Sequence, residues 1–278
     1  MENARLLAIE AAASIFGSFA CIYTGQPLDT IKVRIQATPE AFSGAMQCLR
    51  TTISQEGVAS LWKGATPALS GAVVENIVAF AINKELKLLW PPSDRHAAVQ
   101  PVAYGAVTGA VTAVALCPFD VIKCRVQVAR GTAARRAPNA VEMAQLMVRT
   151  EGMRGFYRGL RAQVARDALF FSMFFGVYDV LVEQAMRRTS FPREVAYIGA
   201  GGLAGVAGWL LSMPFDVLKS RMQVTPHGPR SLSAVARPLV AAGGPRALFA
   251  GVTVTCVRAF PANAALFLGY EVAKRNLE

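Results

Sequence analysis

Charged residues are scarce in this chain, and histidine is almost absent. Only 17% of the 278 residues are Asp, Glu, Lys or Arg, against about a quarter in an ordinary soluble domain. The two histidines, His96 and His227, fall in expected loops, and no Ser/His/Asp triad, metal cluster or Gly-rich phosphate loop accompanies them. The sequence therefore argues against an enzyme, against a metal site and against an ordinary soluble fold.

Paired cysteines and a cleavable leader are missing as well. The five cysteines show no CxxC spacing and no neighbouring histidine, so neither a zinc site nor a disulfide framework is indicated, and we expect free thiols. The N-terminal residues, Met-Glu-Asn-Ala-Arg, show neither a basic region with a cleavage site nor an Arg-rich, acid-free transit pattern. We therefore expect no cleavable targeting peptide.

Long apolar runs take up much of the chain, which is 53% apolar. Six segments approach the ~20 residues that cross a hydrocarbon core. Two carry no charge and one carries only Glu10, whereas the other three carry charges near their middles. The sequence predicts an all-α membrane protein with six transmembrane helices, at Leu6–Leu28, Ala65–Asn83, Ala97–Phe119, Ala162–Tyr178, Val195–Phe215 and Val252–Tyr270.

The net charge of +11 has two interpretations. A nucleic-acid-binding protein gathers its cations on an exposed face with aromatic side chains for stacking. Here many of the cations lie between the expected spans, in the segments that follow Asp29, Asp120 and Asp216. This distribution favours the positive-inside orientation and attraction to anionic lipid. We expect no nucleic-acid partner.

One motif, Pro-x-Asp-x-x-Lys-x-Arg-x-Gln, occurs three times, at Pro27–Gln36, Pro118–Gln127 and Pro214–Gln223. A second element follows each copy: Glu56-Gly57 with Trp62-Lys63-Gly64, Glu151-Gly152 with Tyr157-Arg158-Gly159, and a degenerate Gly243-Gly244 with Phe249-Ala250-Gly251. Such periodicity indicates structural repeats. We expect three two-helix repeats, 1–92, 93–190 and 191–278, arranged with threefold pseudosymmetry around a central cavity.

The triplicated motif with its downstream glycines resembles the mitochondrial carrier family, and the resemblance covers essentially the whole chain. It implies a multi-pass protein of the inner mitochondrial membrane. It also implies transport of a small-molecule substrate by alternating access, and we expect the protein to work as a monomer.

The resemblance implies a gate on the matrix side. The prolines should kink the odd-numbered spans, although a proline can also mark a helix end. Each acid would pair with the base of a neighbouring repeat, because isolated charges near hydrocarbon are costly; solvated charges at helix ends are the alternative. The expected gate comprises kinks at Pro27, Pro118 and Pro214, acids Asp29, Asp120 and Asp216, bases Lys32, Lys123 and Lys219, and bracing glutamines Gln36, Gln127 and Gln223.

The resemblance also implies a gate on the cytoplasmic side. Its aromatic-acid-x-x-base motif is complete only at Tyr270-Glu271-Val272-Ala273-Lys274. Repeat two has Asp179 but Val182 in place of the base, and repeat one has Lys84 in place of the acid, followed by Lys87. Pairs of Asp179 with Lys274 and of Glu271 with Lys87 remain possible, so we expect a weakened outer gate.

Two further patterns concern lipid and helix packing. A cation before a glycine at a helix start suits a phosphate group, and the resemblance identifies the lipid as cardiolipin, while no other cofactor is expected. The expected lipid-binding residues are Gly57, Lys63, Gly64, Gly152, Arg158 and Gly159, and Ala250 makes a third site doubtful. Small-xxx-small spacing predicts close helix packing at Gly105 and Gly109, Gly201 and Gly205, and Ser14 and Ser18.

Charged residues within the spans indicate where a solute binds. Gly71, Arg166 and Arg258 each lie seven residues after the glycine that opens an even-numbered span. Two cations and two acids at this depth suit a zwitterion, although the charges could also pair internally, Arg166 with Glu75 or Arg258 with Asp167. The expected substrate-binding residues are Gly71, Glu75, Asn76, Arg166, Asp167 and Arg258.

Two subgroups of the family are similar to this chain. The segment Arg258–Ala265 resembles carnitine/acylcarnitine carriers, whereas Glu75-Asn76 with Arg166-Asp167 and Arg258 resembles ornithine and basic amino acid carriers. Glu75 favours exchange of ornithine, lysine or arginine, because it would balance the second positive charge of such a solute. Exchange of carnitine and acylcarnitine is the alternative. A membrane adaptor that has lost transport is a further alternative, although the matrix-gate motif is intact in all three repeats.

Overall fold

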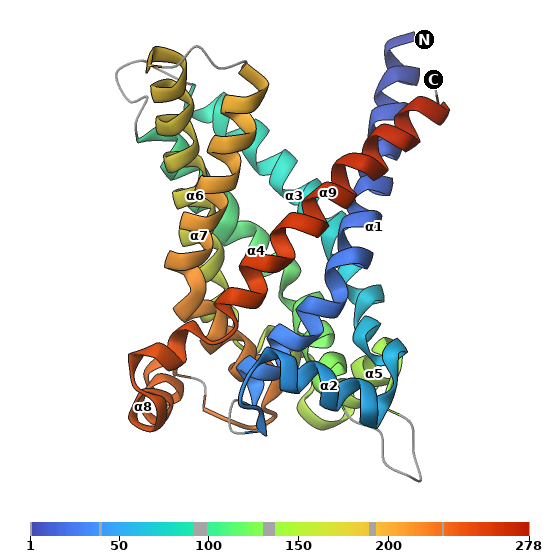
Figure 1. The fold of residues 1–278 in the computed structure, drawn as a ribbon, viewed down its shortest axis with the longest axis vertical. Helices are drawn as coiled ribbons and strands as arrows, with labels where there is room; N and C mark the ends of the chain where they lie inside the picture. Colours follow the sequence, from blue (N-terminus) through green and yellow to red (C-terminus); the bar gives the residue numbers. More distant parts are fainter. Residues whose placement is uncertain are drawn as a thin grey trace. The chain divides into compact units, whose positions relative to one another are not determined.

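The computed structural model describes residues 2–38, 41–91, 99–129, 137–188, 193–229 and 231–277, and every regular element within them is helical (Figure 1). Six helices have 25 to 36 residues. At about 1.5 Å per residue each exceeds the ~30 Å hydrocarbon core, which confirms the all-α fold. The six long helices are α1 Glu2–Ala37, α3 Ala65–Leu89, α4 Gln100–Val128, α6 Leu160–Arg188, α7 Arg193–Val224 and α9 Val252–Leu277.

Length and apolar composition together select four membrane spans among the described residues. These are Val58–Leu89, Gln100–Val128, Ala200–Val224 and Pro245–Asn276, which cover α3, α4, α9 and most of α7. Helix α6 falls outside this set; it carries Arg166 and Asp167 in its N-terminal part and Asp179 in its C-terminal half. Helix α1 also falls outside, and it carries the charged residues of the repeated motif near its C-terminal end.

The prolines of the repeated motif lie inside helices rather than at their ends. Helix α1 continues past Pro27 to Ala37, and Pro118 and Pro214 lie likewise within α4 and α7. The helix-end alternative is therefore wrong for all three prolines. In α1 the segment after the proline is held by burial, since Ile31 and Arg34 are each 2% exposed. The bend itself stays a prediction.

The first long helix of each repeat, α1, α4 or α7, is followed by a short α-helix and a 3-10 helix. The glycines that flank the 3-10 helices have φ between 65° and 83°, a backbone region that side chains with a Cβ rarely adopt. These glycines allow the sharp turns that lead into the next span. The short α-helices are α2 Ala45–Glu56, α5 Ala140–Glu151 and α8 Leu232–Gly243. The 3-10 helices are η2 Val58–Trp62, η4 Met153–Tyr157 and η5 Pro245–Phe249. The glycines are Gly57, Gly64, Gly152, Gly159, Gly244 and Gly251.

The chain forms two compact units. Unit 1 comprises Met1–Val73, Pro118–Phe156 and Thr253–Glu278, and unit 2 comprises Val74–Cys117 and Tyr157–Val252. Helix α4 passes from unit 2 to unit 1 between Cys117 and Pro118, which is at its internal proline. Within unit 1 the N-terminal end of α1 and the C-terminal end of α9 lie at the same end (Figure 1).

Small residues bring helices together within each unit. A Cβ added to Gly105 would lie 2.6 Å from the Phe171 carbonyl oxygen, and one added to Gly109 would lie 2.6 Å from the Asp167 carbonyl oxygen. The close helix packing predicted at these two glycines is therefore confirmed, and the structure shows that the partner helix is α6. The same prediction is wrong for Gly205, whose Cβ would meet no atom within 4 Å. On α1, where Ser14 and Ser18 were the predicted packing residues, Gly17 lies close to α9, and a Cβ added to it would lie 2.7 Å from the Leu266 carbonyl oxygen.

Candidate functional site

The gate acid of the first repeat, Asp29, contacts two cations in unit 1. Lys123 Nζ donates a hydrogen bond of 2.9 Å to Asp29 Oδ2, and Arg258 Nε lies 2.6 Å from Asp29 Oδ1. Lys123 belongs to the second repeat, so the predicted acid–base contact between neighbouring repeats is present here. The contact with Arg258 was not expected, because Arg258 was assigned to the solute site.

The remaining gate charges are largely removed from solvent. Lys32, Asp216 and Lys219 are buried, and Asp120 is half-buried. Lys32 and Asp120 belong to unit 1, and Asp216 and Lys219 belong to unit 2. Because burying a charge is costly unless it is paired, this burial is consistent with ion pairing. The complete six-residue ring stays a prediction.

The three glutamines of the motif are almost completely buried, with exposures of 0 to 1% for Gln36, Gln127 and Gln223. Gln127 Nε2 lies 3.3 Å from Thr30 Oγ1 on α1, and Gln223 Nε2 donates to Gln163 Oε1 on α6 at 3.0 Å. In both cases a glutamine of one repeat reaches the preceding repeat. These contacts support a bracing role, which stays a prediction.

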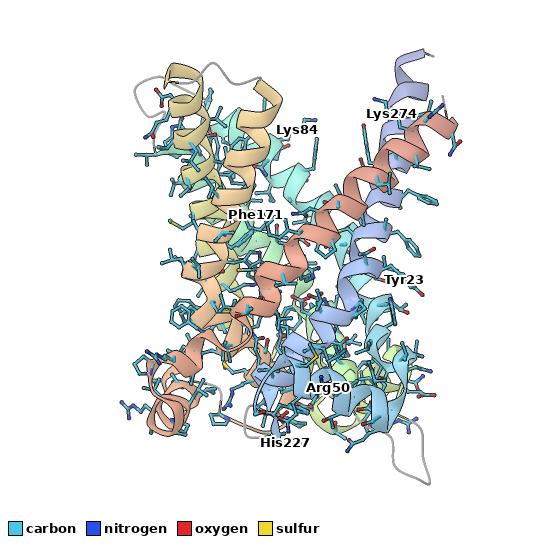
Figure 2. All side chains as sticks on the ribbon, in the orientation of Figure 1. Tyr23, Arg50, Lys84, Phe171, His227 and Lys274 are labelled. Carbon is cyan, nitrogen blue, oxygen red and sulfur yellow. The ribbon has the colours of Figure 1, made fainter. Side chains whose placement is uncertain are left out.

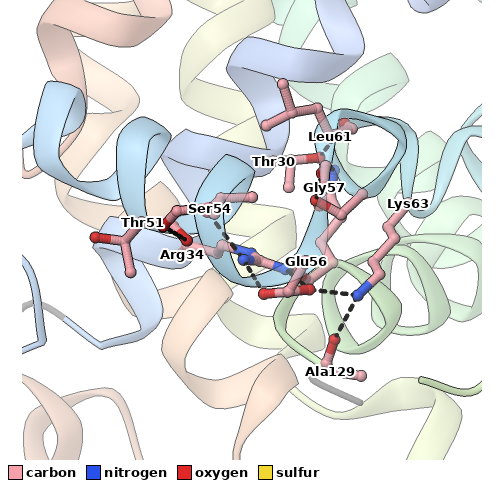
Figure 3. A network of polar contacts seen from close by, with 12 residues as sticks. Thr30, Arg34, Thr51, Ser54, Glu56, Gly57, Leu61, Lys63 and Ala129 are labelled. Atoms are coloured by element: carbon pink, nitrogen blue, oxygen red, sulfur yellow. Dashed lines mark hydrogen bonds and ion pairs between the residues drawn. The ribbon is translucent and has the colours of Figure 1, made fainter. Parts of the chain in front are cut away.

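A buried ion pair beside the gate was missed from the sequence. The Arg34 guanidinium contacts Glu56 with both Nη atoms, one of them at 2.9 Å, and also donates to Thr52 Oγ1 at 3.0 Å (Figure 3). Arg125 and Glu151 form the matching pair in the second repeat. We call each pair an Arg–Glu clamp. The recurrence of the motif arginine together with the Glu-Gly element was a signal that could have predicted both clamps.

The third repeat has the arginine of this clamp but not the acid. Arg34 and Glu56 are 22 residues apart, and 22 residues after Arg221 the chain has Gly243. The degenerate Gly243-Gly244 element therefore removes the carboxylate that the other two repeats use. In this respect the third repeat differs from the first two.

Lys63 extends the first clamp. Its Nζ forms an ion pair with Glu56 and donates to the Ala129 carbonyl oxygen at 3.2 Å (Figure 3). Burial would raise the pKa of Glu56, but the hydrogen bonds from Arg34 and Lys63 outweigh it and lower the pKa from 4.5 to about 2. Glu56 is therefore ionised at any physiological pH.

The predicted lipid-binding residues have the following surroundings. Lys63 contacts Glu56, and Arg158 donates through Nε to the Met222 carbonyl oxygen at 2.9 Å and through Nη2 to the Gly228 carbonyl oxygen. Two of the glycines pack on a gate helix: Gly64 on Lys123 and Gln127 of α4, and Gly159 on Met222 and Gln223 of α7. Gly57 and Gly152 have open space where a Cβ would lie.

The predicted substrate-binding residues are divided between the units. Gly71 and Arg258 belong to unit 1, and Gly71 is buried. The other four belong to unit 2, where Glu75 is half-buried and Asn76 is exposed. Arg166 Nη2 lies 2.6 Å from Asp167 Oδ1, so these sequence neighbours form an ion pair.

Trp209 of α7 also contacts this part of unit 2. The Arg166 guanidinium carbon lies 5.9 Å from the centre of the Trp209 ring, within the range of a cation–π interaction. The sequence did not single out Trp209, because one tryptophan in an apolar span is more often a packing residue. The partners of Arg166 therefore include a carboxylate and an aromatic ring.

The expected cytoplasmic-gate residues lie on α3, α6 and α9. In unit 1, Lys274 Nζ lies 5.9 Å from the Tyr270 ring centre, and Lys274 and Arg50 mark opposite ends of the unit (Figure 2). In unit 2, Lys87 and Asp179 are exposed. The side chain of Glu271 lies outside the described residues. The two cytoplasmic-gate pairs stay predictions.

Comparisons with known proteins identify the family. The family model described as mitochondrial carrier protein matches three consecutive segments, 6–93, 94–189 and 193–278. A mitochondrial substrate carrier family protein of Dictyostelium discoideum is 34% identical, with both chains covered completely. The mouse mitochondrial carnitine/acylcarnitine carrier protein is 32% identical over 94% of this chain and 92% of its own. The rat mitochondrial ornithine transporter 1 is 32% identical over 96% of this chain and 94% of its own. The chain therefore belongs to the mitochondrial carrier family, and is a multi-pass mitochondrial membrane transporter of small molecules.

Proposed function

We propose that this carrier exchanges basic amino acids, such as ornithine, lysine and arginine, across the inner mitochondrial membrane by alternating access. The observation that carries the proposal is a half-buried acid, Glu75, inside the apolar span Val58–Leu89. Ionisable side chains within membrane spans are costly and tend to be functional. An acid at this position matches the side-chain cation of a dibasic solute.

The two arginines supply the site for the other end of the solute. Arg258 lies in unit 1, where its Nε is 2.6 Å from Asp29 Oδ1. Guanidinium Nη groups bind carboxylates well, because two parallel hydrogen bonds can form. Asp167, which is 4% exposed, offers a second acid for the α-ammonium group. A dicarboxylate or a nucleotide would be repelled by these acids.

Exchange of carnitine and acylcarnitines is the second candidate. The relatives include carriers with both names at the same identity. An aromatic stack along α6 favours this candidate: the Phe170 and Phe174 rings lie 6.1 Å apart, and the Phe174 and Tyr178 rings 6.0 Å apart. Aromatic rings attract quaternary ammonium groups. Carnitine has no second positive charge for Glu75 to balance.

In the proposed cycle, a solute enters from the cytoplasmic side and contacts Glu75, Arg166, Asp167 and Arg258. Binding can only switch the carrier if the solute has different affinities for the two states. The ion pairs of Asp29 would separate as the matrix gate opens and re-form as it closes. A carrier of this kind needs gate contacts that are reversible.

An uptake experiment tests the choice of solute. Purified carrier would be reconstituted into liposomes with lysine, ornithine, arginine, carnitine or acetylcarnitine inside and outside. Glu75→Gln should reduce uptake of dibasic amino acids about tenfold or more, as loss of one charged contact would. Glu85→Gln, the same change at an exposed residue of the same helix, serves as control. Unaltered lysine and ornithine uptake in Glu75→Gln would support the carnitine candidate.

We also propose that the protein works as a monomer and binds cardiolipin near Gly57, Lys63, Gly64, Gly152, Arg158 and Gly159. The support for lipid binding is the pair of sharp glycine turns beside a cation in the first two repeats. Mass spectrometry of the carrier released from membranes would measure the copies of cardiolipin per chain. Release as a lipid-free monomer would contradict the cardiolipin proposal alone.

A further inference from the structure

Arg258 reaches Asp29 by passing over a glycine. Gly25 lies on α1, one turn before Asp29, and it is buried. A Cβ built on Gly25 would lie 2.9 Å from Arg258 Nε and 3.3 Å from both Cζ and Nη2, and these are its three nearest neighbours. Any side chain at position 25 would therefore occupy the space that the guanidinium uses.

The other two repeats do not have a glycine at this position. The residue two before the motif proline is Gly25 in the first repeat, Leu116 in the second and Ser212 in the third. Leu116 is 6% exposed and Ser212 is completely buried, so their side chains are packed into the structure. Only the repeat whose gate acid contacts Arg258 lacks a side chain here.

The contact of Arg258 with Asp29 differs from the Arg–Glu clamps. In the first clamp Arg34 is 2% exposed and holds Glu56 with both Nη atoms. Arg258 Nε lies 2.6 Å from Asp29 Oδ1 but makes no well-oriented hydrogen bond, and the side chain of Arg258 is 23% exposed. An ion pair with poor hydrogen-bond geometry and access to water is easier to separate than a buried bidentate pair.

The charges around Asp29 favour an incoming carboxylate. One carboxylate is shared between two cations, Lys123 at 2.9 Å and Arg258 at 2.6 Å. A carboxylate that binds the Nη groups of Arg258 would balance the excess positive charge and compete with Asp29 for the guanidinium. Asp29 would then keep its contact with Lys123.

We propose that Gly25 is a positioning residue that lets Arg258 act as a latch on the matrix gate, and that the solute carboxylate releases this latch. The inference rests on the proposed function, in which Arg258 binds the solute. In the empty carrier Arg258 and Lys123 both hold Asp29, whereas in the loaded carrier Arg258 no longer does so. Switching without solute is thereby disfavoured, which makes the carrier an exchanger.

The variants Gly25→Ala and Gly25→Ser test the latch. The atoms displaced belong to the end of a flexible side chain, so the fold should tolerate both variants while Arg258 moves away from Asp29. Liposomes with and without internal solute give the ratio of unidirectional uptake to exchange. We expect this ratio to rise about three- to tenfold, as loss of one partly exposed ion pair would give, and the apparent KM to fall. Gly202→Ala, whose Cβ meets no atom within 4 Å, is the matched control.

A thermal double-mutant cycle tests the same link without transport. With Arg258 present, Gly25→Ala should lower the unfolding midpoint of the solute-free carrier, because the Cβ displaces the guanidinium. In an Arg258→Ala background the same change should leave the midpoint unchanged or raise it, since alanine favours a helix over glycine. Equal changes in both backgrounds would overturn the proposal.

Two outcomes separate this inference from the proposed function. If the wild-type carrier exchanges carnitine but not basic amino acids, the choice of solute is wrong, and the latch is measured with carnitine, which also has a carboxylate. If Gly25→Ala and Gly25→Ser match Gly202→Ala in both the uptake ratio and the KM, the latch is wrong whichever solute is carried.

Discussion

Arg34, near the C-terminal end of α1, contacts Glu56, the last residue of α2, and both Nη atoms of the arginine contact the carboxylate. The pair joins the C-terminal end of a membrane span to the short helix that follows it. Arg34 also donates through Nε to the Gln127 carbonyl oxygen at 2.9 Å, so one side chain connects the first repeat to the second. Removing it should affect stability more than solute binding.

Arg34→Met should destabilise the carrier strongly. Removal of one partner from a buried ion pair costs about 3–5 kcal/mol, and we expect a loss below this range because Glu56 is partly exposed and Lys63 still contacts it. Thermal unfolding in detergent measures the effect. Arg50→Met, at an exposed residue of α2 (Figure 2), is the control. Equal midpoints for the two variants would contradict the prediction.

Gly243→Glu should create the clamp that the third repeat lacks. Position 243 has the same 22-residue spacing from Arg221 that Glu56 has from Arg34. A glutamate there would supply the missing carboxylate, whereas Gly243→Gln has a similar shape and helix propensity without the charge. A midpoint for Gly243→Glu above that of Gly243→Gln by the equivalent of about 1 kcal/mol is expected. No difference would show that the third repeat cannot form the clamp.

The clamp should make stability depend on pH in acid. The pKa of Glu56 is lowered from 4.5 to about 2, so the folded state binds the proton less readily than the unfolded state. The resulting stabilisation is fully present above pH 4.5 and is lost as the pH falls towards 2. The difference in unfolding midpoint between wild type and Glu56→Gln, measured from pH 7 down to 3, should therefore shrink. A constant difference would argue against the lowered pKa.

The outer gate should control rate more than affinity. Lys274 would pair with Asp179, and Lys87 with Glu271, only when the carrier is closed on the cytoplasmic side. Lys274→Ala and Lys87→Ala should therefore change the exchange rate and leave the apparent affinity nearly unchanged. Initial uptake rates over a range of solute concentrations separate the two quantities. Arg275→Ala, at the exposed neighbour of Lys274, is the control. If neither lysine variant changes rate or affinity, the weakened-gate prediction is wrong.

Elements with a threefold pattern were predictable from the sequence. The motif copies place Asp29 and Lys123 at corresponding positions of neighbouring repeats, and their contact follows from the symmetry. The predicted spans end about nine residues before the C-terminal ends of helices α1, α4 and α7, because hydropathy falls where the motif charges begin. In α1 the helix nevertheless continues, since burial of Ile31 and the contacts of Arg34 hold its last turns.

Contacts that break the symmetry were not predictable in the same way. Counting residues from the opening glycines places Arg258 and Arg166 at equivalent positions, yet Arg258 contacts Asp29 whereas Arg166 contacts Asp167 and Trp209. The difference depends on what lies beside each arginine. Gly25 leaves space on α1, and this space is visible only when α9 is packed against it.

The sequence by itself determined the three repeats, the helical membrane class and the residues that carry charge into the spans, because periodicity, hydropathy and motif spacing are properties of the chain alone. Tertiary structure decided which acid each arginine contacts, and it decided how easily the contact can be separated. A pairing energy depends on distance, on orientation and on exclusion of water, and these arise only when helices from different repeats come together.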